Sequence, residues 1–575
     1  MRHRFLSKYH VLLVCAVPCL ACGEVRPNGI DPGDGGGERP GVDAGGDGAD
    51  AGPNAGRDAS SDRPASAERS SIRGQDRVVA DGETTAEIAI ELLDETGEGV
   101  AGVTPEFAAS GQGNTYEACT ETGDDGVATC GMSSTEAGDK TLEITSPVLV
   151  EGDTIQFLPT CEHGSGIAFG GGSGTADDPY RLCTPAHLEA IGSNSSALDA
   201  TFVVLNDIDM IEVADFAVIG DDDTPFTGEF DGGGFAIRNL TIDRTDASQV
   251  GLFGVIAEGA HIRRAILEDA AVSGADEVGA LAGMSAGEIE NSRATGSVTG
   301  TTSVGGLVGD NRGTIGGASA DVTTTGVSKV GGLAGENIGV IANSHAMGRV
   351  VGEGSVGGLA GLNAADLSGF PRGSILDAHA TGDVSGDELV GGLVGGTARN
   401  SGVENSYATG DVDGTTAVGG LVGSHIGRVK FCFATGDVVA ADSQVGGLVG
   451  RIIGEFGIGG IGTVADSYAV GSASGDTQVG GLVGHSRGVI DNAYAAGQVS
   501  GDTAVGGLVG DNEGKVEASF WDEASAETSD GGAPLETAEF AVQSLFEDEA
   551  GWDFDSHWTI GEAPDGAERP IFQWQ

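Results

Sequence analysis

The sequence predicts an all-β protein built around a parallel β-helix. The pattern V-G-x-L-x-G, or a close variant of it, begins at ten places: Val250, Val278, Val304, Val330, Val356, Val390, Val418, Val445, Val479 and Val505. Successive copies lie 26 to 28 residues apart, apart from two intervals of 34. Gly supplies 103 of the 575 residues, whereas aromatic residues make up only 5%. A fixed period of this size is typical of a solenoid, whose units bury their apolar faces against their neighbours.

Residues 1–21 combine a basic start with an apolar run that is too short to span a bilayer as a mature helix. The run ends in C-L-A-C-G, which resembles a bacterial lipoprotein signal, although Cys19 stands where that family usually has Leu. The resemblance implies removal of residues 1–21 and a lipid on Cys22. Ordinary signal cleavage near the same place is the alternative. Gly23, rather than Asp, after the lipidated Cys implies the outer membrane.

Residues 22–74 consist of Gly, Asp, Ala, Pro, Ser and Arg with almost no large apolar side chain. Such a composition cannot bury enough surface to offset the entropy of ordering, so we expect a flexible, disordered tether. The formal net charge of the chain is -59. This charge repels nucleic-acid phosphates and anionic membrane surfaces, and it keeps a secreted protein soluble. We therefore expect no nucleic-acid partner.

Short strands separated by turns predict a small β-sandwich over residues 75–147, followed by a linker over 148–166. Residues 85–92 alternate apolar and polar side chains, as a half-buried strand does. This region resembles the group 1 bacterial immunoglobulin-like domain of invasin- and intimin-type adhesins, and the resemblance implies a spacer without catalytic residues. The matching segments are 80–82, 88–92, 94–97, 99–103, 122–123, 126–128 and 133–138.

The remaining chain divides into a lead-in over 167–247, coils over 248–520 and a C-terminal cap over 521–575. The lead-in includes an amphipathic helix over 185–191. Together with the ten repeated motifs, these segments resemble GLUG-motif proteins, which fold as right-handed parallel β-helices. The matching segments outside the repeats are 177–182, 206–209, 226–234, 237–242, 520–522, 530–532, 551–554 and 558–560.

A single coil is predicted to contain three strand-like runs divided by Gly-rich corners. In one repeat these runs cover 403–410, 411–414 and 417–423. Glycine recurs where a corner needs positive φ or a close backbone approach. The two intervals of 34 carry extra residues within 364–373 and 455–462, which we expect to emerge as loops.

The cysteines indicate an oxidising compartment. The expected disulfide candidates are Cys119, Cys130, Cys161 and Cys183, with the first two closing a short loop and the other two falling around a domain junction. Cys432 occupies a position that is Ser in the preceding coil, so we expect a small buried residue. No C-x-x-C spacing supports a zinc site.

The sequence gives no support for a catalytic site. None of the ten His residues forms H-E-x-x-H, the zinc helix of the IgA-cleaving metallopeptidases that GLUG motifs accompany. We expect no nucleophile elbow, because the spacing G-x-S-x-G occurs only at 283–287 and 484–488, inside the repeated coils, and no phosphate-binding G-x-x-x-x-G-K loop occurs. Acidic residues are expected to be scattered through solvent-facing turns. We therefore expect no catalytic residues, no metal and no cofactor.

One column of the repeat predicts a binding surface. The residues that share this column are Arg293, His345, His379, Tyr407, Phe433, Tyr468, Tyr494 and Phe520. Because Arg and His share this column with Tyr and Phe, we expect the column to face water and offer a strip of stacked rings to sugars or to another protein. The expected binding residues are Tyr407, Phe433, Tyr468 and Tyr494. The alternative is that the rings only cover the side of the helix.

These features favour a non-enzymatic, monomeric lipoprotein of the outer membrane that is exposed on the cell surface. A periplasmic or secreted location is the alternative. The expected function is adhesion to cells, matrix or polysaccharide, through an unidentified protein or glycan ligand. A carbohydrate-active β-helix enzyme and a purely structural envelope protein are the competing interpretations.

Overall fold

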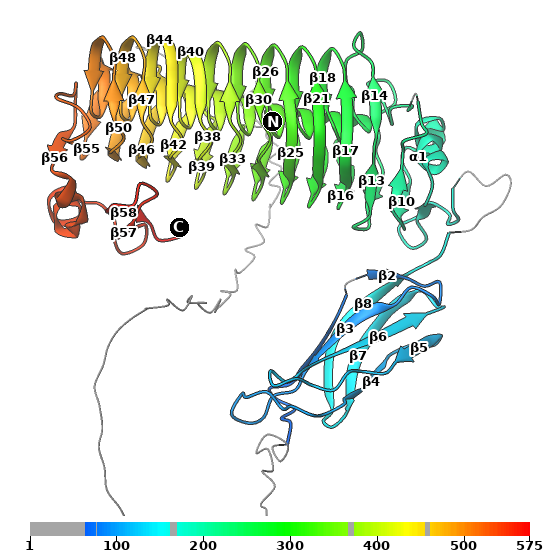
Figure 1. Ribbon diagram of the computed structural model, residues 1–575. Coiled ribbons are helices and arrows are strands. Elements are labelled where there is room, and N and C mark those ends of the chain that lie inside the picture. The colour runs from blue at the N-terminus through cyan, green and yellow to red at the C-terminus, as the bar shows by residue number, and fades with distance from the viewer. Residues whose placement is uncertain (1–63, 76, 162–168, 215, 366–372, 455–460) are drawn as a thin grey trace, which may run out of the picture. The chain divides into compact units, whose positions relative to one another are not determined.

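The computed structural model describes residues 64–75, 77–161, 169–214, 216–365, 373–454 and 461–575. The expected signal, Cys22 and most of the expected tether lie outside the described residues. The described part is almost entirely β-structure (Figure 1). Within it, no helix has the length and apolar character needed to cross a membrane.

The first domain is a sandwich of two four-stranded sheets, as expected. One sheet has the order β1 (Ser71–Gly74), β3 (Ala86–Glu91), β6 (Val127–Ser134), β5 (Asn114–Glu117), and the other β2 (Arg77–Val79), β8 (Val150–Leu158), β7 (Gly138–Ser146), β4 (Glu106–Ala109). The domain is longer than the expected 75–147, because β1 precedes that range and β8 follows it. Ile155 and Phe157 of β8 are buried in the core. Residues 150–158 are therefore a strand of the sandwich rather than part of a linker.

The β-helix begins with β9 (Tyr180–Leu182), whose parallel neighbour is β10 (Thr201–Val204). Helix α1 (Pro185–Gly192) forms where the sequence predicts it and buries Leu188 and Ile191. The other elements of this lead-in are η1 (Ser195–Ala197), β11 (Ile208–Asp209), β12 (Glu229–Asp231), β13 (Ala236–Arg238) and β14 (Thr241–Asp243).

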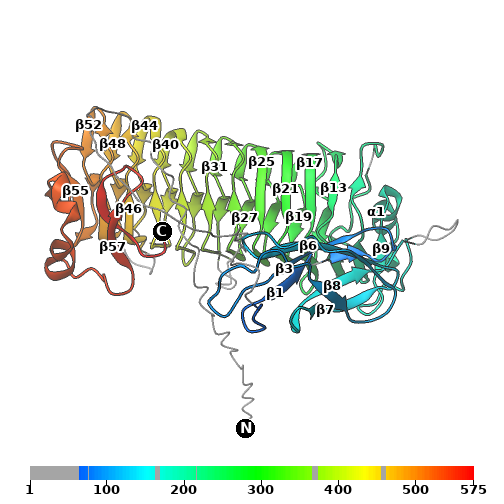
Figure 2. The ribbon, with the colours of Figure 1, turned by 60° about the horizontal axis from the view of Figure 1, so that its bottom comes forward.

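The coils then stack strand upon strand in parallel register (Figure 2). A ten-stranded sheet contains β15 (Phe253–Ile256), β19 (Ala282–Ser285), β23 (Val308–Asn311), β27 (Ala334–Asn337), β32 (Ala360–Asn363), β37 (Val394–Thr397), β41 (Val422–His425), β45 (Val449–Ile452), β49 (Val483–Ser486) and β53 (Val509–Asn512). The strands that precede these in each coil are β18 (Asp276–Gly279), β22 (Thr302–Gly305), β26 (Ser328–Gly331), β31 (Gly354–Gly357), β36 (Glu388–Gly391), β40 (Val412–Gly419), β44 (Val438–Gly446), β48 (Thr477–Gly480) and β52 (Thr503–Gly506).

Two further series of strands complete the coils. The first contains β16 (His261–Arg263), β20 (Glu288–Glu290), β24 (Thr314–Gly316), β28 (Val340–Ala342), β33 (Ser374–Leu376), β38 (Gly402–Glu404), β42 (Arg428–Lys430), β46 (Thr463–Ala469), β50 (Val489–Ala495) and β54 (Lys515–Glu517). The second contains β17 (Ile266–Ser273), β21 (Arg293–Thr299), β25 (Ser319–Thr325), β29 (His345–Ala346), β34 (His379–Ala380), β39 (Tyr407–Ala408), β43 (Phe433–Ala434) and β55 (Phe520–Asp522), with short strands β30 (Val350–Val351), β35 (Val384–Ser385), β47 (Ala473–Ser474) and β51 (Val499–Ser500) beyond it.

The coil departs from the three runs that the sequence predicts. The expected run over 403–410 is broken at Asn405, which adopts positive φ (50°), so β38 and β39 are separate strands. The expected corner at Gly414 lies inside β40, which continues to Gly419. Asn readily adopts the left-handed conformation. The same corner in other coils is formed by Asn291, Asn343 and Asn492.

The repeated motif is a corner between two sheets rather than a strand. In the copy at Val418, β40 ends at Gly419, the chain bends through Gly420 and Leu421, and β41 begins at Val422. Val418, Leu421 and Val422 are fully buried. A Cβ on Gly419 would collide with the carbonyl oxygen of Val422, so this glycine is needed for a close backbone approach. The copy at Val250 is one residue shorter, because Leu252 follows Gly251 directly.

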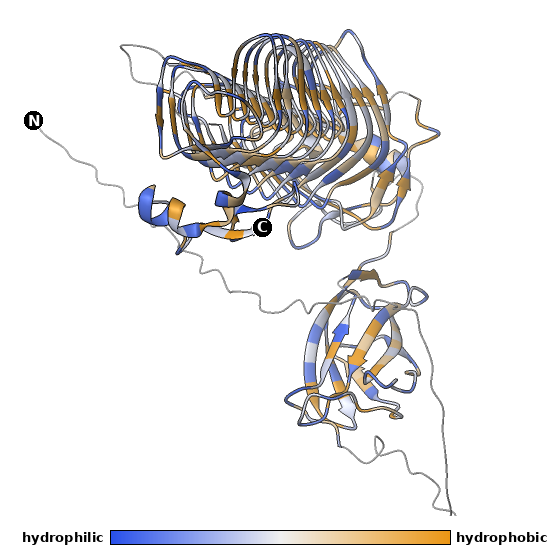
Figure 3. Ribbon diagram, turned by 60° about the vertical axis from the view of Figure 1, so that its left-hand side comes forward, coloured by the Kyte–Doolittle hydropathy of each residue, from blue (hydrophilic) through white to orange (hydrophobic). Residues whose placement is uncertain are grey.

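Polar side chains are also stacked inside the helix. Asn311, Asn337 and Asn363 form a buried ladder, in which the Nδ2 of Asn311 donates to the Oδ1 of Asn337 at 2.7 Å and the Nδ2 of Asn337 to the Oδ1 of Asn363 at 2.8 Å. The Nδ2 of Asn363 donates in turn to the carbonyl oxygen of Gly402 at 3.0 Å, whereas the buried Oδ1 of Asn311 has no hydrogen-bond partner among the described residues. Apolar and polar residues alternate along the coils in Figure 3.

The C-terminal segment leaves the last coil and returns along its side (Figures 1 and 2). Its elements are β56 (Ala533–Leu535), η2 (Thr537–Ala541), η3 (Leu545–Glu549) and the antiparallel hairpin of β57 (Trp558–Glu562) and β58 (Glu568–Phe572). Residues before β56 cover the edge of the last coil, where the N–H of Asp530 donates to the carbonyl of Val509 at 3.1 Å and the N–H of Gly507 to that of Thr528 at 2.8 Å.

Candidate binding surface

The expected binding residues form one register column on the outside of the coils. Parallel pairing aligns His345 with His379, and Tyr407 with Phe433, and it continues through Tyr468 and Tyr494 to Phe520. Ser319 lies between Arg293 and His345 in this column, although the column predicted from the sequence does not include it. Next to each ring from His345 to Tyr494 lies a buried alanine, such as Ala408, so these rings face outward while the alanines fill the core.

The rings of this column are stacked face to face. Successive centroids are 4.9 Å apart for His345–His379, 4.7 Å for His379–Tyr407, 4.8 Å for Tyr407–Phe433, 5.1 Å for Phe433–Tyr468 and 4.9 Å for Tyr468–Tyr494, with interplanar angles of 1° to 6°. Each inner ring therefore covers both of its faces with its neighbours. A sugar stacks on the face of a ring, so the column itself does not offer the sugar platform expected from the sequence, because only ring edges point outward.

Three of the four expected binding residues are also covered by the C-terminal segment, contrary to the expectation of a water-facing strip. Tyr468 and Tyr494 are 0% exposed and Phe433 is 5% exposed. The hydroxyl of Tyr494 donates to the carbonyl oxygen of Pro570 at 2.8 Å, and the side chain of Gln575 lies 2.7 Å from the hydroxyl of Tyr468. Burial raises the pKa of both phenols. Phe433, Tyr468 and Tyr494 therefore have the alternative role, in which the rings cover the side of the β-helix.

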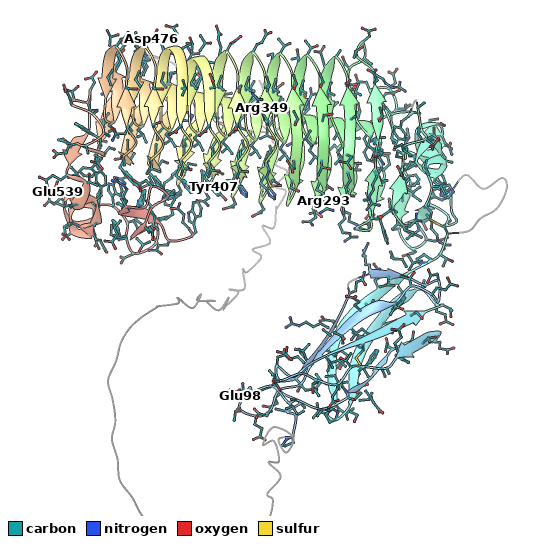
Figure 4. The ribbon with its side chains drawn as sticks, in the orientation of Figure 1. Glu98, Arg293, Arg349, Tyr407, Asp476 and Glu539 are labelled. Atoms are coloured by element: carbon teal, nitrogen blue, oxygen red, sulfur yellow. A yellow bond between two sulfur atoms is a disulfide. The ribbon has the colours of Figure 1, made fainter. Side chains whose placement is uncertain are left out.

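Tyr407 is the one expected binding residue that stays half-exposed (Figure 4). It lies at the margin of the C-terminal segment, where its ring centroid is 6.4 Å from that of Trp574. His345 and His379 are also half-exposed, and Trp574 is 47% exposed. We call the group His345, His379, Tyr407 and Trp574 the aromatic margin.

Trp574 was not among the expected site residues. A signal for it exists, since Phe572 and Trp574 are two residues apart and alternate with Gln573 and Gln575, as on one face of a strand. The surface of the coils that Trp574 contacts could not be predicted in the same way, because Tyr407 and Phe433 are far from Trp574 in the sequence.

Three of the acidic residues expected in scattered turns, Asp383, Asp411 and Asp437, form a column. The N–H of Asp411 donates to Oδ1 of Asp383 at 3.2 Å, the N–H of Asp437 to Oδ1 of Asp411 at 2.9 Å, and the N–H of Ser472 to Oδ1 of Asp437 at 3.0 Å. Each carboxylate thus binds the backbone of the next coil. This arrangement gives the carboxylates a structural role along the turn.

One cluster of the described residues has the atoms that a metal ion would need, namely His485, Asp511 and Glu513. The Nδ1 of His485 lies 3.1 Å from Asp511, which also accepts from Gln478. Arg487 holds Glu513 through two hydrogen bonds of 2.9 and 3.1 Å. In the structure, His485, Asp511 and Glu513 therefore form hydrogen-bonded ion pairs with each other and with Arg487.

A groove of about 460 Å³ lies beside the corner from which both long insertions leave the helix. Its lining includes Asn400, Ile426 and Ile461, together with the ion pair between Glu404 and Arg428 at 3.2 Å. The inserted residues 366–372 and 455–460 lie outside the described residues. The charged groups of this groove satisfy each other.

The structure pairs the cysteines as the sequence arithmetic allows, Cys119 with Cys130 and Cys161 with Cys183. Cys432 is free and fully buried, and burial raises the pKa of its thiol to about 12. Its N–H donates to the hydroxyl of Ser467 in the next coil at 3.2 Å. Cys432 is thus a small interior residue in a serine column, as expected, and not a reactive thiol.

Comparison with known families agrees with this architecture. Residues 72–157 match the bacterial Ig-like domain (group 1), and residues 352–385 and 386–413 match the GLUG motif. The sandwich therefore has the sequence features of the immunoglobulin-like domains of bacteria, and the coils carry GLUG motifs on a β-solenoid.

Two curated relatives are similar to parts of the chain. Halomucin of Haloquadratum walsbyi is 33% identical over 174 residues, which are 28% of this chain and 2% of halomucin. A "Putative Gly-rich membrane protein" of Evansella cellulosilytica is 39% identical over 131 residues, 21% of this chain and 15% of the relative. The chain thus spans a small fraction of the length of both relatives.

Among solved structures, a "putative immunoglobulin A1 protease" from Bacteroides ovatus is similar at 18% identity and a TM-score of 0.33, over 72% of this chain and 97% of that one. The assignment of the β-helix rests on the strand register described above and on the GLUG matches.

Proposed function

We propose that this chain is a non-enzymatic cell-surface lipoprotein that displays its β-helix for binding to cells, matrix or polysaccharide. The observation that carries the proposal is the aromatic margin. Four rings that are half-exposed or exposed gather at one place on a protein whose surface is otherwise dominated by acidic and small polar residues. Exposed aromatic side chains in a cluster mark interaction sites more often than scattered single ones do.

The surrounding architecture fits a protein that displays a binding surface better than an enzyme that turns over a substrate. Among the described residues, the stacked coils form a long side that has no deep cleft lined by converging catalytic groups. The carboxylates of Asp383, Asp411 and Asp437 accept hydrogen bonds from the backbone of the next coil. Small-molecule enzymes usually enclose their substrates in a concave pocket. A carbohydrate-active enzyme and a purely structural envelope protein are the alternatives that the experiment must separate.

Attachment is proposed through a lipid on Cys22, with residues 23–63 as the tether, the immunoglobulin-like domain as a spacer, and a single copy of the chain as the working form. Two disulfides support an extracytoplasmic location, because such bonds persist in oxidising compartments. The outer membrane of a diderm cell, with the helix outward, is the location we propose.

The test uses the full chain in a diderm host, alongside Cys22→Ala. Membrane fractionation should find the wild type with the outer membrane and the variant in the soluble fraction. Protease added to intact cells should remove the β-helix from the wild type. If the β-helix is cut only after lysis, the surface-display proposal fails.

A binding assay completes the test. The purified full chain, labelled with a fluorophore, should bind to cells or to immobilised polysaccharide and release no reducing ends. Release of reducing ends would support the enzyme alternative. Surface exposure without any binding would support the structural alternative.

A further inference from the structure

The C-terminal segment adds a second row of rings above the stacked column. Trp552 and Trp558 have centroids 4.7 Å apart, Trp558 and Phe572 4.6 Å, and Phe572 and Trp574 5.2 Å. The last pair is nearly parallel, with an interplanar angle of 11°. Trp574 is therefore the final ring of a continuous row.

The row has a direction along the coils. Phe572 contacts the rings of Phe433 and Tyr468, whereas Trp574 contacts those of Tyr407 and Phe433, one coil nearer the N-terminus. The plane of Trp574 is tilted by only 29° from that of Tyr407. Since Phe572 covers one face of Trp574, the other face is directed toward the coils that carry His379 and His345.

That second face is open in the described structure. Trp574 is 47% exposed, whereas the other three tryptophans, Trp521, Trp552 and Trp558, are 5%, 2% and 0% exposed. Among the described residues, its ring contacts are those with Tyr407, Phe433 and Phe572. Among the residues that the structure describes, no aromatic side chain therefore occupies the next position in the row, beside Trp574 and over the ring of His379.

Most of the groups around this position are polar, and the coil of His379 also carries the exposed carboxylates of Asp377 and Asp383. The imidazoles of His379 and His345 form the floor, and the exposed hydroxyls of Thr381 and Thr409 lie two residues beyond the rings on the same outward side of the coils. Burial, together with the neighbouring His345, lowers the pKa of His379, which favours the neutral imidazole. Neutral imidazole and hydroxyl groups can both donate and accept hydrogen bonds.

An open aromatic face bordered by such groups selects a ligand that has one apolar face and a rim of hydroxyls. A pyranose ring has both, and the net charge of -59 disfavours anionic glycans. We propose that the open face of Trp574 stacks on a pyranose ring of a neutral glycan, with the adjoining sugar lying over the edges of His379 and His345. This assignment rests on the proposed binding function and names its ligand class.

The proposed contact of a sugar with Trp574 differs from the stacking of sugars along the column of rings that the sequence predicts. One ring with a free face carries the contact, and the stacked column beneath it supplies a fixed floor. Loss of the Trp574 indole should therefore abolish most of the affinity, while the buried column stays intact because Phe433, Tyr468 and Tyr494 keep their own contacts with Phe572 and Trp558.

The experiment uses the full chain with cellohexaose, maltohexaose and a hexamer of galacturonic acid as probes. Acrylamide quenching of tryptophan fluorescence reports on Trp574, because the other tryptophans are buried. A neutral hexaose should reduce this quenching and bind in calorimetry, and the uronic acid hexamer should do neither. Trp574→Ala should weaken binding at least tenfold and Trp574→Phe a few-fold, with unchanged thermal unfolding of both variants.

Val439→Ala is the matched control, since Val439 is 49% exposed on β44 and away from the aromatic margin; it should bind like the wild type. Neutral hexaose binding that persists in Trp574→Ala overturns the assignment. Binding of the chain to cells without binding to any neutral hexaose, or self-association abolished by Trp574→Ala, overturns the sugar class and leaves the proposed function standing. Absence of binding to cells and to glycans alike overturns both.

Discussion

The hydroxyl of Tyr494 donates a hydrogen bond of 2.8 Å to the carbonyl oxygen of Pro570, which is 76 residues further along the chain. Tyr494 belongs to the outward column of the coils and Pro570 to strand β58 of the C-terminal hairpin. This bond, within a fully buried contact, fixes the hairpin on the side of the helix. It also explains why an outward column of rings does not face water there.

We expect Tyr494→Phe to destabilise the docked hairpin by about 1–3 kcal/mol, because the buried carbonyl of Pro570 loses its partner while the ring remains. Tyr494→Ala should cost about 3–5 kcal/mol, since it also leaves a cavity. Chemical denaturation followed by tryptophan fluorescence measures both changes. Val439→Ala, an exposed substitution, should stay within about 0.5 kcal/mol of the wild type. Equal stability of Tyr494→Phe and the wild type would contradict the importance of the hydrogen bond.

The glycines of the repeat differ in their tolerance to a side chain. Gly419→Ala should destabilise by about 1–3 kcal/mol, because its Cβ would overlap the carbonyl oxygen of Val422. Gly402→Ala is the matched control, since a Cβ there meets nothing within 4 Å. That substitution should be neutral, or stabilising by up to about 1 kcal/mol through the unfolded state. Thermal unfolding compares the two variants, and similar losses for both would show that the corner does not depend on this close approach.

The fold could be predicted because the period and the small apolar residues of the coils are local signals. The helix at 185–191 is similarly local, since Leu188 and Ile191 fall on one face. The corner at Asn405 escaped prediction because a run such as 403–410 gives no sign of where a positive φ interrupts it. Asn and Asp at the same place in several coils were the available hint.

The site was harder to predict for a geometric reason. Composition at one column indicates that Tyr407, Tyr468 and Tyr494 share an environment, yet parallel stacking turns their faces toward each other. Whether an outward ring meets water depends on a segment that is distant in the sequence, such as Pro570, which lies 76 residues beyond Tyr494. The packing of Phe572 against Phe433 has no local sequence signal. Long-range packing therefore decided which part of the column became a surface.

A buried carboxyl should make stability depend on pH. Burial is the main cause that raises the pKa of Asp310 to about 6 from 3.8, against the opposing effect of Arg312. The folded state thus holds the proton more tightly than the unfolded state. The protonated Asp310 therefore contributes to the free energy of unfolding fully below pH 4. This contribution, about 3 kcal/mol in total, is lost as the pH rises to about 6.

Asp310→Asn should remove this part of the pH dependence. The free energy of unfolding, measured in denaturant at several values between pH 4 and 7, should fall less with rising pH in the variant than in the wild type. Asp321→Asn, at an exposed position of strand β25, is the control and should keep the wild-type slope. A variant slope equal to that of the wild type would mean that Asp310 is not the group responsible.

The serine column around Cys432 sets the last prediction. Ser406 and Ser467 occupy the same position in the adjacent coils, both are 0% exposed, and each hydroxyl accepts the N–H of the residue one coil earlier. In a chain that begins at Gly23, the single free thiol should react with Ellman's reagent only after unfolding, because it is buried and its pKa is about 12. Cys432→Ser should stay within about 1.5 kcal/mol of the wild type, whereas Cys432→Leu should lose about 1–3 kcal/mol through overpacking. Rapid labelling of the native chain would contradict the burial of this column, and a stable Cys432→Leu variant would show that the space between neighbouring coils is larger than the structure describes.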